Sequence, residues 1–166
     1  MFGTDLVIFE EESKRLNESL AKLVEESKAK SVYLIDKNGQ LIASYGETQG
    51  MDTTSLASLA AGNIAATGGL AQLIGEQEFS VIFHEGQRDN LHISIVAKRV
   101  ILLVIFDDRT SLGLVRLRVK KGSLELTEIF AAVMQKAEAR SADVSQMMET
   151  RFAEITDADI DNLFKT

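Results

Sequence analysis

The sequence predicts a three-layer α/β/α sandwich built on a five-stranded antiparallel sheet. Its hydrophobic patterns follow the order α-β-β-α-β-β-β-α along the chain. Residues 100–106 (VILLVIF) are apolar at every position, so helices must cover both faces of this strand. The segments 87–90 and 98–99 join the last three strands and are far shorter than a parallel crossover, which needs about a dozen residues. These strands are therefore expected to form an antiparallel meander.

The first helix is predicted over residues 10–30, where Leu16, Leu20 and Leu23 recur at helical spacing among charged residues. Two β-prone runs follow, 31–37 and 40–45. The Asn38-Gly39 pair between them tolerates positive φ and predicts a tight hairpin with a type I′ turn.

The second helix is predicted over residues 55–75, after the capping residues 52–54. On a helical wheel its large apolar residues gather on one side and are expected to dock on the sheet: Leu56, Leu59, Leu70, Leu73 and Ile74. A second stripe carries small or uncharged residues: Ser58, Gly62, Ala65, Gly69 and Gln72. This stripe either receives the backbone of a partner or lets the helix pack tightly inside its own subunit.

Strands are predicted over 79–85, 91–97 and 100–107, followed by a third helix that starts after Thr110-Ser111 and ends near residue 139. The middle helix is expected on one face of the sheet, and the first and third helices on the other. Residues 141–153 show no clear periodic pattern and are interpreted as a flexible linker. The expected domains are therefore a globular domain (1–140), this linker and a short acidic C-terminal helix (154–166).

Composition narrows the chemistry that the chain can perform. The 166 residues include no Cys, Pro or Trp and only two His, and their net charge is −7. Thiol catalysis, disulfides and Cys-ligated zinc are excluded. No phosphate-binding Gly-Lys-Ser/Thr loop and no Gly-x-Ser-x-Gly elbow occurs, and basic residues cluster only at 116–121. We therefore expect no catalytic residues, no metal, no cofactor and no nucleic-acid partner.

Neither the two histidines nor any apolar segment indicates a metal site, a membrane span or an export signal. His84 and His92 fall on neighbouring strands where they could face each other, but they lack further ligands, and we interpret them as ordinary strand residues. The longest apolar run is far shorter than the ~20 residues of a membrane helix, and the acidic residues 10–12 do not resemble a signal peptide. The expected protein is cytoplasmic and does not insert into membranes.

The C-terminal segment has its own helix signals. Thr156 is placed to cap, Asp159 occupies the capping-box position, and Ile155 can pack against Ile160. The helix is too short to be stable alone, so it is expected either to fold against a partner or to remain a frayed tail.

Several stretches together resemble the Roadblock/LC7 family, and in particular its bacterial members that work with a Ras-like GTPase in cell polarity and motility. They are residues 34–42 (LIDKNGQLI), 52–76, 83–86 (FHEG), 104–121 with the core FDDRTSLG, and 154–164. The resemblance implies the family's profilin- and longin-like sandwich and a homodimer in which the third strands pair and the middle helices lie side by side. It places the dimer contact at Phe79, Val81, Phe83 and Glu85.

The resemblance also implies where a small GTPase binds. Its main docking surface falls on the middle helix, at Ser58, Ala61, Gly62, Ala65, Gly68, Gly69 and Gln72. A second contact that affects nucleotide exchange falls on the tail, at Ile155, Ile160, Leu163 and Phe164. The family's cell biology implies a position at a cell pole.

The resemblance implies GTPase activation by realignment of the GTPase's switch segments, without a donated arginine finger. The candidate fingers Arg99, Arg109, Arg116 and Arg118 are therefore expected not to act in hydrolysis. The alternative function is a scaffold of the same fold that binds a GTPase without stimulating it. An enzyme with its own active site is the third and least supported interpretation.

Overall fold

The computed structural model describes residues 6–164, so the first five and last two positions of the predicted domains lie outside it. The chain divides into one compact unit of residues 9–131 and a second that includes residues 132–164. Within the described residues, no helix is long and apolar enough to cross a membrane.

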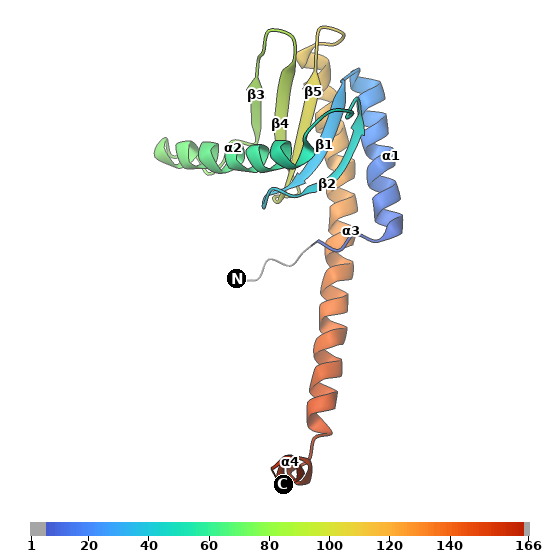
Figure 1. The fold of residues 1–166 in the computed structure, drawn as a ribbon. Helices are drawn as coiled ribbons and strands as arrows, with labels where there is room; N and C mark the ends of the chain where they lie inside the picture. Colours follow the sequence, from blue (N-terminus) through green and yellow to red (C-terminus); the bar gives the residue numbers. More distant parts are fainter. Residues whose placement is uncertain (1–5, 165–166) are drawn as a thin grey trace. The chain divides into compact units, whose positions relative to one another are not determined.

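The elements occur in the predicted order, with a separate short helix at the end (Figure 1). They are α1 (Glu10–Ser27), β1 (Ser31–Asp36), β2 (Leu41–Gly46), α2 (Thr53–Leu73), β3 (Val81–His84), β4 (Asn90–Val96), β5 (Val100–Phe106), α3 (Leu112–Ala153) and α4 (Asp157–Leu163). The five strands form one antiparallel sheet in the order β2-β1-β5-β4-β3. The predicted fold class and the meander of the last three strands are confirmed. The edges of this sheet are β2 and β3.

The two faces of the sheet carry separate cores, because successive side chains of a strand point to opposite faces. Tyr33 and Ile35 of β1 lie with Ile101 and Leu103 of β5 in the core that α2 covers. The intervening residues Val32, Leu34, Leu102, Val104 and Phe106 are equally buried and face the other side. Every residue of β5 is buried, as a strand covered on both faces requires.

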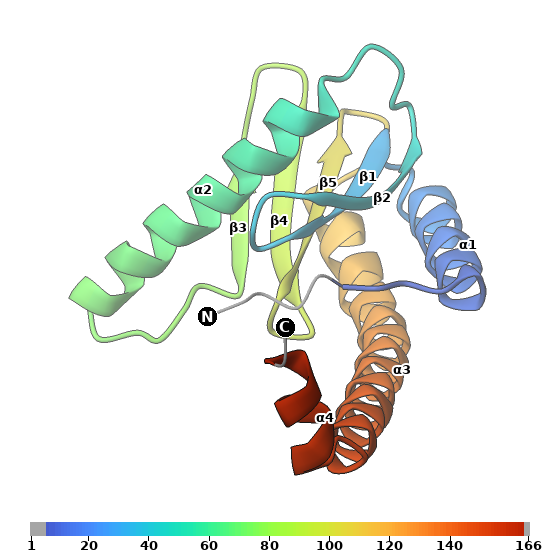
Figure 2. The same ribbon diagram turned by 60° about the horizontal axis from the view of Figure 1, so that its bottom comes forward.

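Helices α1 and α3 cover the face opposite α2. Figures 1 and 2 show α2 crossing one face of the sheet while the first part of α3 lies behind it. Helix α1 packs against this part of α3: a Cβ added at Gly122 would lie 3.6 Å from Leu23 Cδ1, and Arg118 pairs with Glu26 at 3.1 Å. Buried side chains of both helices, such as Leu20 and Leu126, complete the layer. Burial of each of these side chains stabilises the fold by about 1.5–3 kcal/mol relative to leaving it exposed.

The first hairpin forms where predicted, but with a different turn. A type I′ turn needs positive φ at both central residues. Only Gly39 has it (φ 87°), and Gly39 N donates to Asp36 O at 2.8 Å while Asp36 N donates to Gln40 O at 2.8 Å. The loop is therefore one residue longer than predicted. Asp36 stabilises this longer loop, because its Oδ1 accepts from Asn38 N at 2.8 Å.

Residues 141–153, expected as a flexible linker, are helical and belong to α3. The segment has no Gly or Pro and contains Ala, Met, Gln, Glu and Arg, all good helix formers. The weak periodicity reflected the absence of a buried face, since every residue of this segment is exposed. It did not reflect a lack of helix propensity.

Candidate functional site

Helix α2 docks on the sheet through small residues rather than through its leucines. Its buried residues are Ala57, Ala60, Ile64 and Ala71. The side expected to dock is turned outward: Leu59 is 73% exposed, Leu70 58%, Leu73 83% and Ile74 70%, and only Leu56 packs against the core. That expectation was wrong because alanines let the helix approach the sheet more closely than leucines would.

The outward surface of α2 contains the predicted small-residue stripe. Ser58, Gly62, Ala65, Gly69 and Gln72 are exposed, and Ala61 and Gly68 are half-buried at its margin. A Cβ added at Gly62, Gly68 or Gly69 would have no non-neighbouring atom within 4 Å. Packing inside the subunit therefore does not require glycine at these positions.

The whole of α2 lacks a charged residue, which is unusual for a helix with a broad exposed side. Alongside it runs a shallow hollow lined by Ala61, Ala65, Gly68, Gln72 and two charged residues of other elements, Lys37 and Glu78. Lys37 Nζ and Glu78 Oε1 pair at 3.1 Å. The uncharged surface is therefore bordered by a neutralised ion pair.

The start of α2 is fixed by its N-cap. The Asp52 carboxylate accepts from Ser55 N at 3.1 Å and from Ser55 Oγ at 2.6 Å. These bonds lower the pKa of Asp52, with the Ser55 hydroxyl as the main cause. The cap predicted from residues 52–54 is therefore present, and it sets where the exposed surface of the helix begins.

The edge strand β3 is shorter than predicted. Val81 and Phe83 lie in it and are 43% and 38% exposed, whereas Phe79 and Glu85 lie just outside its ends. Phe83 stacks on Phe106, with ring centroids 6.1 Å apart. Among the described residues, β3 pairs with β4 alone, so its outer edge carries backbone groups without a strand partner.

The two histidines point to opposite faces of the sheet, contrary to the suggestion that they could face each other. His84 pairs with Leu91 in register, and His92 pairs with Phe83. His84 Nε2 lies 3.4 Å from Asn63 Nδ2 on α2, whereas His92 is buried on the face that carries α3. Within residues 6–164, no three His, Asp or Glu side chains are grouped to hold a metal.

The environment of His92 is unfavourable for a charged imidazole. Burial lowers the pKa of His92, and the nearby Arg116 lowers it further. Its Nδ1 has no hydrogen-bond partner among the described residues. His92 is thus a neutral core residue, as the interpretation as an ordinary strand residue expects.

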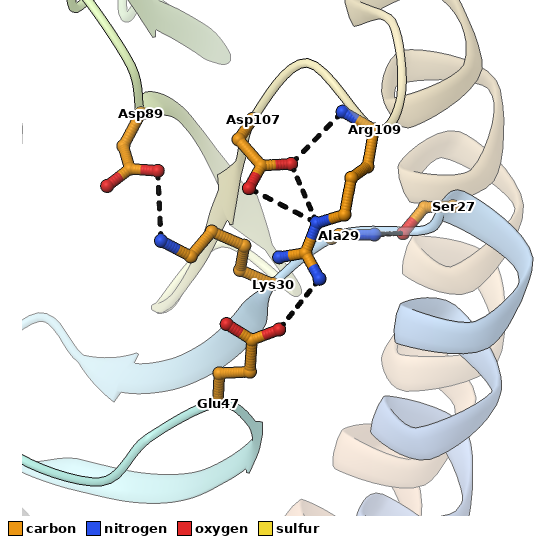
Figure 3. A network of polar contacts seen from close by, with 7 residues as sticks. All are labelled: Ser27, Ala29, Lys30, Glu47, Asp89, Asp107 and Arg109. Carbon is orange, nitrogen blue, oxygen red and sulfur yellow. Dashed lines mark hydrogen bonds and ion pairs between the residues drawn. The ribbon is translucent and has the colours of Figure 1, made fainter.

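Two of the four candidate arginine fingers are held by carboxylates. Arg109 Nε donates to Asp107 Oδ1 at 2.9 Å, and its Nη1 donates to Glu47 Oε1 at 2.8 Å (Figure 3). These bonds raise the pKa of Arg109, Asp107 being the main cause, and lower that of Asp107. Arg118 is half-buried in its pair with Glu26.

The polar contacts of Arg109 belong to a group at one end of the sheet. Lys30, at the start of β1, donates to Asp89 Oδ1 at 3.0 Å, and Arg109 joins the loops after β2 and β5 (Figure 3). Each of these charges has a partner: the Lys30–Asp89 and Arg109–Glu47 pairs join different loops, and the Arg109–Asp107 pair lies within one loop. The arrangement holds loops together and presents no convergent group for catalysis.

The tail helix α4 has the predicted cap. Asp159 Oδ2 accepts from Thr156 N at 2.9 Å and from Thr156 Oγ1 at 2.8 Å, which lowers the pKa of Asp159. The predicted contact residues are all exposed: Ile155, Ile160, Leu163 and Phe164. The helix is formed by local bonds and leaves its apolar side chains uncovered.

Comparison with known proteins identifies the family. The Roadblock/LC7 domain model matches residues 16–106, and no curated protein matches. A solved structure of Myxococcus xanthus MglB is 61% identical, covers 77% of this chain and 96% of its own, and superposes with a TM-score of 0.73. The gliding protein MglB of Thermus thermophilus is 32% identical, with 77% and 97% covered and a TM-score of 0.71. A structure described as MglB with tetrameric arrangement is 30% identical, with 80% and 99% covered and a TM-score of 0.74. The chain belongs to the Roadblock/LC7 family and is closely similar to bacterial MglB proteins.

Proposed function

We propose that the chain is a homodimeric activator of a Ras-like GTPase of the MglA type, acting in bacterial cell polarity and in gliding or twitching motility. The observation that carries the proposal is the exposed side of α2, which has no charge and is lined by small residues on a chain 61% identical to Myxococcus xanthus MglB. The similarity to a protein named for gliding supports the biological setting.

The GTPase docks on the small-residue stripe of α2. Three glycines there have open space where a Cβ would stand, although glycine inside a helix costs about 1 kcal/mol relative to alanine. Because these glycines lower helix stability and improve no packing inside the subunit, they support a surface shaped for another protein. Small side chains let a partner's backbone approach the helix closely.

Two copies join through the outer edge of β3 and through the exposed leucines of α2. An unpaired edge strand is a template for pairing with another chain. Leu59, Leu70 and Leu73 are more than half exposed on the neighbouring side of α2, where a second α2 would cover them. The stripe and the leucines thus serve different partners.

Hydrolysis is stimulated by alignment of the GTPase's own groups. Arg109 and Arg118 are committed to carboxylates of this chain, so releasing either as a finger would require breaking those pairs. The chain supplies a rigid platform that shifts the switch segments of the GTPase. It has no active site of its own.

The tail supplies a second contact. Its helix α4 has an acidic first turn, and Leu163 and Phe164 are 81% and 82% exposed. Folding of this segment against the GTPase would bury these side chains and affect nucleotide exchange. The double substitution Leu163→Asp with Phe164→Asp should change nucleotide exchange by the GTPase without affecting the stimulation of hydrolysis through α2. Unchanged nucleotide exchange would show that the tail makes no such contact.

The test is phosphate release by the purified GTPase with and without this protein. Stimulation that needs both proteins supports an activator. Binding without stimulation supports the scaffold instead, and release by this protein alone would support an enzyme. Ala65→Arg should abolish binding, whereas Leu124→Arg, an exposed position of α3 on the opposite face of the sheet, should not.

A further inference from the structure

The second half of α3 exposes large apolar side chains. Val144 is 48% exposed, Met147 60%, Met148 59% and Phe152 71%. Every described residue from 138 to 164 is exposed. A helix with such a stripe in water gains by covering it.

Two residues of this stripe, Val144 and Met148, lie at the spacing of a seam between two helices. Ser141, Val144, Met148 and Arg151 follow one another at intervals of three, four and three residues, the pattern of the a and d positions of a coiled coil. Arg140, Met147 and Glu154 are seven residues apart and therefore line one flank of that seam. In antiparallel pairs, this flank of one helix faces the same flank of the other.

The charges on the flank are complementary to their own copy in the antiparallel direction. Arg140 and Glu154 lie seven residues before and after Met147. When the two Met147 flanks face each other in an antiparallel pair, Arg140 of each copy lies opposite Glu154 of the other. A parallel pair would instead bring the two Arg151 side chains together at a d position of the seam.

These charges have no partner inside the described chain. None of the ion pairs found among residues 6–164 includes Arg140, Arg151 or Glu154. Arg140 and Glu154 are separated by fourteen residues, about 21 Å along a helix, so they cannot pair within one copy.

We propose that residues 140–154 pair antiparallel with the same segment of a second copy, about a two-fold axis at Met147. Val144 of each copy packs on Met148 of the other, and the two Met147 side chains meet. Ser141 lies opposite Arg151, and such polar positions in a seam fix register and direction at some cost in stability. This contact is separate from β3 and α2, so it joins two of the proposed dimers into a tetramer.

Cross-linking tests the geometry directly, because the full chain has no native cysteine. Under mild oxidation, Met147→Cys should form a disulfide-linked species of twice the chain mass. Glu149→Cys, two residues away and turned to the opposite side of the helix, is the matched control. Equal cross-linking of both variants, or none at Met147→Cys, would overturn the proposal.

The direction of the pair is tested with two further cysteines. A mixture of Arg140→Cys and Glu154→Cys should cross-link mainly between the two variants. Predominant cross-linking of Arg140→Cys to itself would indicate a parallel pair and refute the proposed arrangement.

Charge reversal tests the source of specificity by analytical ultracentrifugation. Arg140→Glu and Glu154→Arg, each alone, should weaken association about tenfold and halve the assembly mass at concentrations where the unaltered protein is associated. Mixing the two variants, or combining both changes in one chain, should restore it, because each flank is again complementary. Persistent dissociation in both cases, or no effect of either single change, would contradict the pairing. The mass halves whether the starting unit is a dimer or a monomer, so the result does not depend on the proposed function.

Discussion

Replacing Gly62 and Gly69 by alanine should make the protein more stable and its GTPase complex weaker. Both residues lie inside α2 without positive φ, and a Cβ at either would have nothing within 4 Å. Each replacement should stabilise the fold by about 0.8–1.0 kcal/mol. The sites lie two turns apart and share no partner, so the effects should add to about 2 kcal/mol. In a chain of this size that raises the melting temperature by roughly 4–8 °C.

Gly75 provides the matched control for this reasoning. A Cβ there would also meet nothing within 4 Å, but its φ is 83°, where a side chain is strained. Gly75→Ala should therefore destabilise the protein by about 1–2 kcal/mol. Thermal unfolding measures all three variants, and titration with the GTPase measures docking.

Lower stability of the Gly62 and Gly69 variants would refute this account of α2, since it would mean that the glycines serve packing within their own subunit. Unchanged affinity for the GTPase would remove the stripe from the docking surface. If the mass of the assembly halved instead, the stripe would belong to the contact between copies.

Three further predictions concern the packing, the pH dependence and the edge strand. Ala60→Leu should cost about 1–3 kcal/mol in denaturant unfolding because the Ala60 side chain of α2 is buried against the sheet, whereas Leu124→Ala, at an exposed position of α3, should change stability by less than about 0.5 kcal/mol. The pKa of His92 is lowered in the fold, so below its ordinary value of about 6.5 the unfolded chain binds a proton that the folded chain resists. Stability should fall as the pH drops below that value, and His92→Leu should flatten this slope; identical slopes would exclude His92 as the cause. Val81→Asp should halve the mass of the proposed β3-paired dimer, and an unchanged mass would rule out that contact.

The layers of the fold could be predicted because single segments contained the necessary information. An entirely apolar strand such as β5 can only be buried on both faces, and the short loops on either side of β4 permit only antiparallel neighbours. These two constraints determine much of the architecture. Neither constraint requires deciding which face of a helix packs on the sheet.

The orientation of α2 could not be predicted in this way. The helix has no charge to mark its solvent side, and it offers two apolar faces, one with leucines and one with Ala57, Ala60 and Ile64. The sheet selects the smaller residues because they permit a closer approach. Which face is chosen depends on the shape of the sheet, a tertiary property.

Whether the two histidines share a face, and whether residues 141–153 are helical, could not be decided from the sequence for related reasons. Whether His84 and His92 share a face depends on strand register, and a shift of one residue reverses every side chain. Residues 141–153 are helical without a buried face, so their pattern of apolar residues carried little information. The site residues on α2 and β3 remain predictions that depend on a partner.

We propose that docking on α2, and no arginine of this chain, drives hydrolysis by the GTPase. Single-turnover GTP hydrolysis tests it with Ala65→Arg beside alanine variants of Arg99, Arg109, Arg116 and Arg118. We predict that Ala65→Arg abolishes the stimulation and that each arginine variant retains it. A loss of roughly a thousandfold in any one arginine variant, with binding to the GTPase unchanged, would contradict that claim.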